Sequence, residues 1–253
     1  MLDFINTISL YNVYNFSAWG IFHFCWILIT IISIALVFKF HFSKTLNALY
    51  VLGLIILLSC EFYNQFVNSF KSGSFNYNLN FIPLTFSCSA IFTFGLCVIL
   101  RKGKLYEYLS TYNASFCLIA SLPTFIFPEA VFSTSLTASI LQMLRSTIIT
   151  LIGFTAIKTF AKTFSDKKII GAIVIFALFV AIGETVHFVS HSFDSNNSTF
   201  FFLDNLQNLP VVSHLYKAYP YWAFALLCYV LFVEIAIFIV FIAFKIANKK
   251  KRY

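Results

Sequence analysis

Three residues able to exchange protons or bind a metal lie near the end of one apolar stretch, Ile169 to Ser190. They are Glu184, His187 and His191, and spacings of three and four place such side chains on one face of a helix. A carboxylate at membrane depth is costly unless it faces a protein interior or a water-filled cavity. Zinc could take these ligands, but no His-Glu-x-x-His pattern is present and His191 falls close to a loop. We therefore favour hydrogen bonding at this position, and the sequence predicts no metal and no cofactor.

Two further ionisable residues, Arg145 and Glu61, also lie inside apolar stretches. At about 1.5 Å of rise per residue, Glu184 lies about 9 Å below the outer end of its span, and Arg145 and Glu61 lie at a similar level. An unpaired charge in hydrocarbon is strongly unfavourable. We expect Arg145 to pair with Glu184 or Glu61, with Glu184 preferred. The pair would border a polar cavity or, in the alternative interpretation, would only join helices.

Other polar residues reach the same layer from neighbouring stretches. The predicted cavity draws on four spans and comprises Glu61, Thr85, Gln142, Arg145 and Glu184. Cys88 and Ser87 are candidate nucleophiles, with His187 as a candidate base. The competing interpretation is that these hydroxyl groups bond their own helix backbone, as they commonly do in membrane helices.

The composition defines the class of protein. The chain has 253 residues, of which 60% are hydrophobic and 10% are charged, whereas soluble domains carry about 25% charged residues. The net charge is +8, but the basic residues occupy short connections and a tail, which is how membrane topology is encoded and is not a nucleic-acid-binding pattern. The sequence therefore predicts an all-α, multi-pass membrane protein that binds no nucleic acid and contacts membrane lipids.

Seven apolar stretches come near the roughly 20 residues that span a bilayer. We place them at about Ala18–Phe38, Leu46–Phe66, Asn80–Leu100, Leu105–Phe127, Leu136–Ile157, Ile169–Ser190 and Tyr221–Phe244. The fourth is the weakest, because its first half is polar. Together they predict one transmembrane domain over residues 18–244.

Positive charge alternates between the connections. The first, third and fifth connections and the tail carry two, three, four and five basic residues, fourteen of the 17 in the chain. Because cytoplasmic connections are enriched in Lys and Arg, this predicts an external N-terminus and a cytoplasmic C-terminus in a cell membrane, most simply the plasma membrane of a bacterium. Residues 1–17 are then an external or interfacial segment, residues 191–220 an external cap loop and residues 245–253 a basic cytoplasmic tail.

Short motifs are spread over most of the chain. They read Trp19-Gly20-x-x-His23, Ile82 to Cys88 (IPLTFSC), Pro128-Glu129, Thr199 to Leu203 (TFFFL), Pro210 and Pro220-Tyr221-Trp222. In these motifs the chain resembles the YwaF-like integral membrane proteins, which are similar to the animal transmembrane acyltransferases acting on ether phospholipids. The resemblance implies seven spans and acyl transfer by a Cys of the third span with a His of the fifth.

The chain departs from that pattern at the catalytic positions. Ser87 stands where the Cys is expected and Cys88 follows it, while Thr85 replaces a third-span His and Arg145 lies near the expected fifth-span His. The catalytic pair of the family is therefore not retained. Either the activity is lost, or it is rebuilt from Cys88 with His187.

These observations predict an outer-half polar cavity that handles a lipid or small amphiphile, with a divergent acyl-transfer enzyme as one form of that function. A transport or solute-binding module is the alternative, and a non-catalytic membrane scaffold is a further one.

Overall fold

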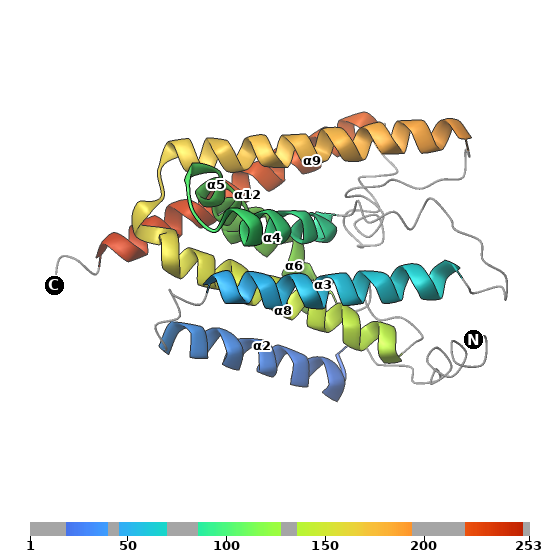
Figure 1. The fold of residues 1–253 in the computed structure, drawn as a ribbon, viewed down its shortest axis with the longest axis horizontal. Helices are drawn as coiled ribbons and strands as arrows, with labels where there is room; N and C mark the ends of the chain where they lie inside the picture. Colours follow the sequence, from blue (N-terminus) through green and yellow to red (C-terminus); the bar gives the residue numbers. More distant parts are fainter. Residues whose placement is uncertain (1–18, 40–45, 70–85, 128–135, 194–220, 250–253) are drawn as a thin grey trace.

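The computed structural model describes residues 19–39, 46–69, 86–127, 136–193 and 221–249, and these residues are almost entirely helical. No strand occurs in this part of the chain. The helices form an elongated bundle (Figure 1). The prediction of an all-α protein is confirmed.

Five long helices provide most of the bundle. They are α2 (Ile21–Lys39), α3 (Leu46–Ser69), α8 (Leu136–Phe160), α9 (Asp166–Phe193) and α12 (Tyr221–Lys249). A sixth long segment is composite: α5 (Lys104–Tyr112), the π-helix η4 (Asn113–Cys117), α6 (Leu118–Ser121) and α7 (Pro123–Ile126) follow one another. These six are long and apolar enough to cross a membrane, which supports a multi-pass membrane protein.

The remaining apolar helix is shorter. It begins with the 3₁₀ turn η3 (Phe86–Cys88) and continues as α4 (Ser89–Leu100). The predicted third span begins at Asn80, and residues 70–85 lie outside the described part. The structure thus shows six candidate spans, and the seventh stays a prediction.

The composite segment from α5 to α7 lies at the centre of the bundle. In its most apolar stretch 72% of the residues are buried, against 17% in the corresponding stretches of α2 and α9. It packs against α4, α8 and α9. Its polar first half, which weakens the prediction from sequence, therefore faces protein.

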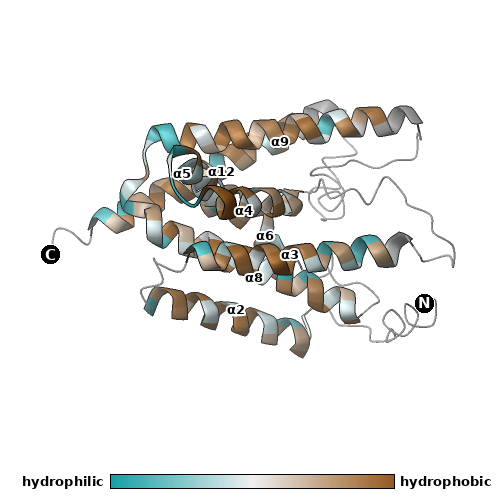
Figure 2. Ribbon diagram, viewed as in Figure 1, coloured by the Kyte–Doolittle hydropathy of each residue, from teal (hydrophilic) through white to brown (hydrophobic). Residues whose placement is uncertain are grey.

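The bundle is apolar on the outside. Large hydrophobic side chains are exposed along α2, α3, α9 and α12, whereas Ser, Thr, Asn and Arg side chains are buried between helices. This arrangement fits a bundle surrounded by lipid, because lipid tails offer no hydrogen-bonding partners and polar groups must find them inside the protein. Figure 2 shows hydrophilic residues gathered at one end, where α8 ends and α9 begins. We call this the basic end.

The connection between α4 and α5 is a tight turn at the basic end. Arg101 adopts the left-handed conformation (φ 53°) after α4, and its N–H donates to the Cys97 carbonyl at 3.0 Å. Gly103 has φ 101°, where a side chain would be strained. The reversal brings α5 back along α4, so that residues of both helices can share one polar interior.

Candidate functional site

The predicted polar layer assembles around α3, η3 and α8. Arg145 on α8 and Glu61 on α3 form a salt bridge, with 3.5 Å between Nη2 and Oε2. The side chains are 5% and 13% exposed, so the charges are buried together. The salt bridge selects Glu61 from the two partners considered for Arg145.

Cys88 completes this cluster. Arg145 Nη2 donates to Cys88 Sγ at 2.7 Å, and the thiol lies 3.7 Å from Glu61 Oε2 as a donor. Cys88 is buried and ends the 3₁₀ turn that leads into α4. One sulfur therefore contacts both a guanidinium and a carboxylate, which we call the Cys88 cluster.

Neighbouring groups hold the Cys88 cluster in place. Gln65, one turn after Glu61 on α3, donates from Nε2 to Glu61 Oε1 at 2.6 Å. Cys60 donates to the Leu141 carbonyl at 3.6 Å and thereby also connects α3 with α8. Arg145 Nε is buried and has no hydrogen-bond partner within the described residues. The guanidinium thus retains one donor that the described protein groups do not satisfy.

A guanidinium and a carboxylate flanking a thiol have a defined chemistry. The thiolate is the nucleophilic form of cysteine, and a neighbouring cation stabilises it. A carboxylate within reach of the thiol can accept its proton. The Cys88 cluster therefore contains a nucleophile, a proton acceptor and a positive charge.

Glu184 is not part of the Cys88 cluster. Its Oε1 accepts a hydrogen bond from the Tyr229 hydroxyl of α12, so the pair joins α9 to α12. The preference for Glu184 as the partner of Arg145 is wrong, because the α3 carboxylate is the one that reaches the guanidinium.

The other predicted site residues are only partly covered by the structure. Ser87 is half-buried beside Cys88, and Gln142 is half-buried one turn before Arg145 on α8. Thr85 lies outside the described residues, as does the side chain of His187. The described residues contain no group of three His, Cys, Asp or Glu side chains placed to hold a metal ion.

A second polar network, which the sequence analysis missed, lies around the π-helix η4. Asn113 Oδ1 accepts from Thr93 at 2.7 Å and from the Cys117 thiol at 3.3 Å. Asn113 Nδ2 donates to the Tyr50 hydroxyl at 3.4 Å, and Tyr50 in turn donates to Ser110 at 3.2 Å. All five residues are buried. Polar residues in the first half of the fourth apolar stretch were the available signal.

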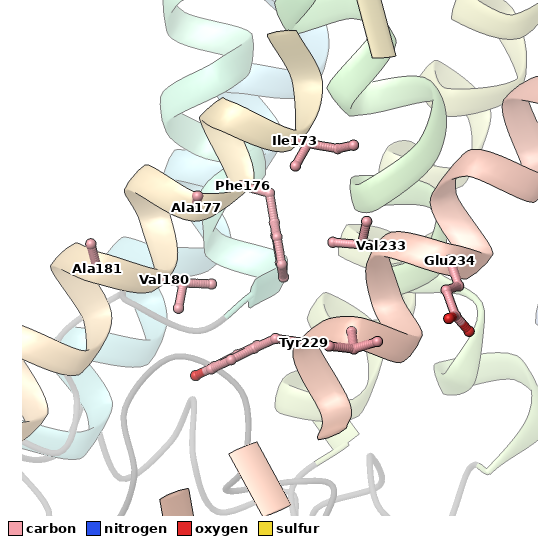
Figure 3. A pocket seen from close by; sticks show the side chains of 9 residues that line it. Ile173, Phe176, Ala177, Val180, Ala181, Tyr229, Val233 and Glu234 are labelled. Atoms are coloured by element: carbon pink, nitrogen blue, oxygen red, sulfur yellow. The ribbon is translucent and has the colours of Figure 1, made fainter. Parts of the chain in front are cut away.

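An apolar groove lies between α9 and α12. It has a volume of about 410 Å³ and is lined by Ile173, Phe176, Ala177, Val180, Ala181, Tyr229, Val230, Val233 and Glu234. Figure 3 shows Val233 and Tyr229 directed toward α9, while the Glu234 carboxylate lies on the far side of α12. We call it the α9–α12 groove.

One aromatic layer separates this groove from the turn that carries Cys88. Phe176 of the groove meets Phe86 edge-on, with 5.7 Å between ring centroids, and stacks on Phe116 at 4.5 Å. Phe86 precedes Ser87 and Cys88 in η3. One short turn therefore contacts the groove residue Phe176 through Phe86 and the Arg145–Glu61 pair through Cys88.

Comparison with known proteins returns no relative: no family model, no curated protein and no solved structure matches the chain.

Proposed function

We propose that the chain is a seven-helix protein of a bacterial plasma membrane, with its N-terminus outside, and that it transfers an acyl group of a lipid or small amphiphile through Cys88. The observation that carries the proposal is the contact of Cys88 Sγ with both Arg145 Nη2 and Glu61 Oε2. The resemblance to YwaF-like proteins supports the same class of reaction. Glu61 takes the part of the base that the sequence analysis gave to His187.

The first half-reaction acylates the thiol. Glu61 accepts the thiol proton while the sulfur attacks the carbonyl carbon of a lipid ester. Arg145 stabilises the thiolate, because its N–H points at the sulfur. The ester C–O bond breaks, and the leaving alcohol takes the proton from Glu61. The products are an alcohol and a thioester on Cys88.

The second half-reaction releases the acyl group. An acceptor hydroxyl gives its proton to Glu61, and its oxygen attacks the thioester carbonyl. The C–S bond breaks, and the sulfur recovers the proton from Glu61. Cys88 and Glu61 thereby return to their starting states, as covalent catalysis requires.

The α9–α12 groove offers a place for the acyl chain. Its walls are apolar, and Phe176 and Phe86 lie between it and the turn that carries Cys88. A ligand site of this kind combines apolar walls with few polar groups. Movement of these two rings would connect the groove with the sulfur.

A structural role for the Cys88 cluster is the second candidate. Cys88 is 2% exposed, and the salt bridge joins α3 to α8, as a pin between helices would. In that case the thiol would need no access for a substrate. The two candidates differ in whether Cys88 ever carries an acyl group.

The test is a search for the thioester. The purified full chain is reconstituted with phosphatidylcholine carrying deuterated oleoyl chains, and its intact mass is measured before and after hydroxylamine. We expect a hydroxylamine-sensitive oleoyl adduct that maps to Cys88 and that Cys88→Ala abolishes. Cys25→Ala, which removes an exposed cysteine of α2, should retain the adduct.

Two results would reject acyl transfer at this site. One is an adduct that survives in Cys88→Ala. The other is a chain without an adduct, together with an unchanged lipid profile when Cys88→Ala replaces the natural chain in cells.

A further inference from the structure

A larger cavity lies at the basic end, far from the Cys88 cluster. It has a volume of about 840 Å³ and is bounded by residues of α2, α6, α8, η6 (Ala161–Thr163) and α12. This volume falls within the range of about 300–1,000 Å³ typical of small-molecule pockets. Lys158, on its rim, is 13 positions beyond Arg145 on α8, about 20 Å along the helix axis. The cavity is therefore a separate site.

The described charged side chains that line this cavity are all basic. Among the described residues that line it are two lysines, Lys158 and Lys162, and no acidic residue. Lys158 Nζ donates to the carbonyls of Val37 and Phe38, at 2.6 and 3.0 Å, which fixes its ammonium group at the end of α2. Lys162 is exposed, four positions later. Both lysines line the same cavity, and two ammonium groups in one cavity fit a phosphate.

The remaining wall is apolar and reaches the lipid-facing surface. Phe238, Ile242 and Ile246 line the cavity and are also 62%, 38% and 59% exposed. Leu118 and Leu122 lie at its inner side. A ligand there would have its hydrocarbon part against α12 and the bilayer, so a lipid fits this wall better than a soluble anion.

The position along the bundle agrees with such an occupant. Lys158 and Lys162 lie where α8 ends, at the end of the bundle where hydrophilic residues gather (Figure 2). Basic residues at this level attract the anionic lipids of the cytoplasmic leaflet. Basic pockets between membrane helices on that side bind lipid head groups.

We propose that the cavity between α8 and α12 binds one anionic phospholipid, with its phosphate between Lys158 and Lys162 and an acyl chain along the α12 wall. The site is independent of acyl transfer at Cys88. Its lipid is a bound component of the bundle, which joins the ends of α2, α8 and α12.

Native mass spectrometry of the purified full chain tests this proposal. The detergent-solubilised protein is presented with equal amounts of dioleoyl-phosphatidylglycerol and dioleoyl-phosphatidylcholine. We expect one phosphatidylglycerol to be retained in preference to phosphatidylcholine. Lys162→Gln should weaken that retention about fivefold, since one lysine near the head group is lost.

Lys167→Gln is the matched control, because Lys167 is exposed at the same end and does not line the cavity. It should leave retention unchanged. Ala247→Phe narrows the cavity from the α12 side and keeps both charges, so it should also lower retention. It tests the same site if Lys162→Gln gives no folded protein.

Three outcomes would overturn the proposal. They are equal retention of the two lipids by the natural chain, equal losses in Lys162→Gln and Lys167→Gln, and full retention in Ala247→Phe. Equal losses in the two lysine variants would show that surface charge at the basic end, and not the cavity, attracts the lipid.

Discussion

Arg145 contacts a thiol and a carboxylate through one nitrogen, Nη2, and this arrangement makes three helical elements depend on one charge. Removal of one partner from a buried ion pair leaves the other charge buried without compensation, which is usually more costly than removal of both. The three side chains of the Cys88 cluster should therefore respond as a unit to substitution.

Glu61→Gln tests this dependence. We expect the free energy of unfolding in mixed detergent micelles to fall by about 3 kcal/mol, because the buried guanidinium loses its countercharge. The double change Glu61→Leu with Arg145→Met should recover most of that loss, since no charge is left buried.

Glu107→Gln is the control for this comparison, because Glu107 forms a salt bridge with Lys168 that is partly exposed at the basic end. It should change the free energy of unfolding by no more than about 1 kcal/mol. Equal effects of Glu61→Gln and Glu107→Gln would contradict the importance of the buried pair.

The sequence was informative about these residues to a limited extent. The cost of a charge in hydrocarbon predicts that Arg145 has a carboxylate partner, and depth along each span leaves Glu61 and Glu184 as candidates. The choice between them depends on which helices are neighbours. Because α3 packs against α8, Glu61 forms a salt bridge with Arg145. Because α9 contacts α12, Glu184 accepts a hydrogen bond from Tyr229 instead.

Among the helices, α5 and α9 approach closely at a glycine. A Cβ atom built on Gly171 of α9 would lie 2.6–2.9 Å from ring atoms of Tyr108 on α5. These distances are below van der Waals contact, so the helices can be this close only while position 171 has no side chain. Gly95 of α4 differs, since the nearest atom to a Cβ there is Leu54 Cδ1 at 3.9 Å.

Gly171→Ala should destabilise the protein by about 1–3 kcal/mol, because the Tyr108 ring must move out of a packed interface. Gly95→Ala adds the same methyl group without a clash and should be neutral or stabilising by up to about 1 kcal/mol, since alanine favours helix. Melting temperatures of the two variants in the same detergent provide the comparison. Equal shifts would contradict close packing at Gly171.

The extent of most helices was predictable from length and apolarity, since six of the seven predicted stretches coincide with long helical segments. The position of each helix within the bundle was not predictable from these properties. The stretch that includes Asn113 is the least apolar of the six, yet it is the central segment of the bundle. Apolar content reports contact with lipid, whereas Asn113 contacts Thr93, Tyr50 and Cys117 inside the protein.

For the whole molecule, the alternation of basic connections gives the strongest expectation about topology. Lys102, Lys162 and Lys167 all lie at the end of the bundle where α4 and α8 end. Enrichment of cytoplasmic connections in basic residues would place this end inside the cell. An odd number of spans would then leave the N-terminus outside.

Labelling of introduced cysteines tests the topology, with the exposed Cys25 removed and the other five natural cysteines buried. The predicted cytoplasmic position of the basic end is tested in a chain with Cys25→Ala, where a membrane-impermeant maleimide should label Lys167→Cys in inside-out vesicles and not in intact cells. Asp3→Cys should show the reverse. Labelling of both positions from one side would instead indicate an even number of spans.

The burial of the segment from α5 to α7 also bears on how the chain is inserted into a membrane. Asn113, Ser110 and Tyr112 have their hydrogen-bonding partners largely on α3 and α4, which are made earlier. In its C-terminal half, Thr124 accepts a hydrogen bond from Ser146 and Ser121 bonds to Thr150. Ser146 and Thr150 belong to α8, which is made later. A polar helix enters a bilayer poorly by itself. We therefore expect this segment to leave the translocation machinery together with its neighbours, so that the central helix settles only after α8 has been made, although it is the fourth to be synthesised.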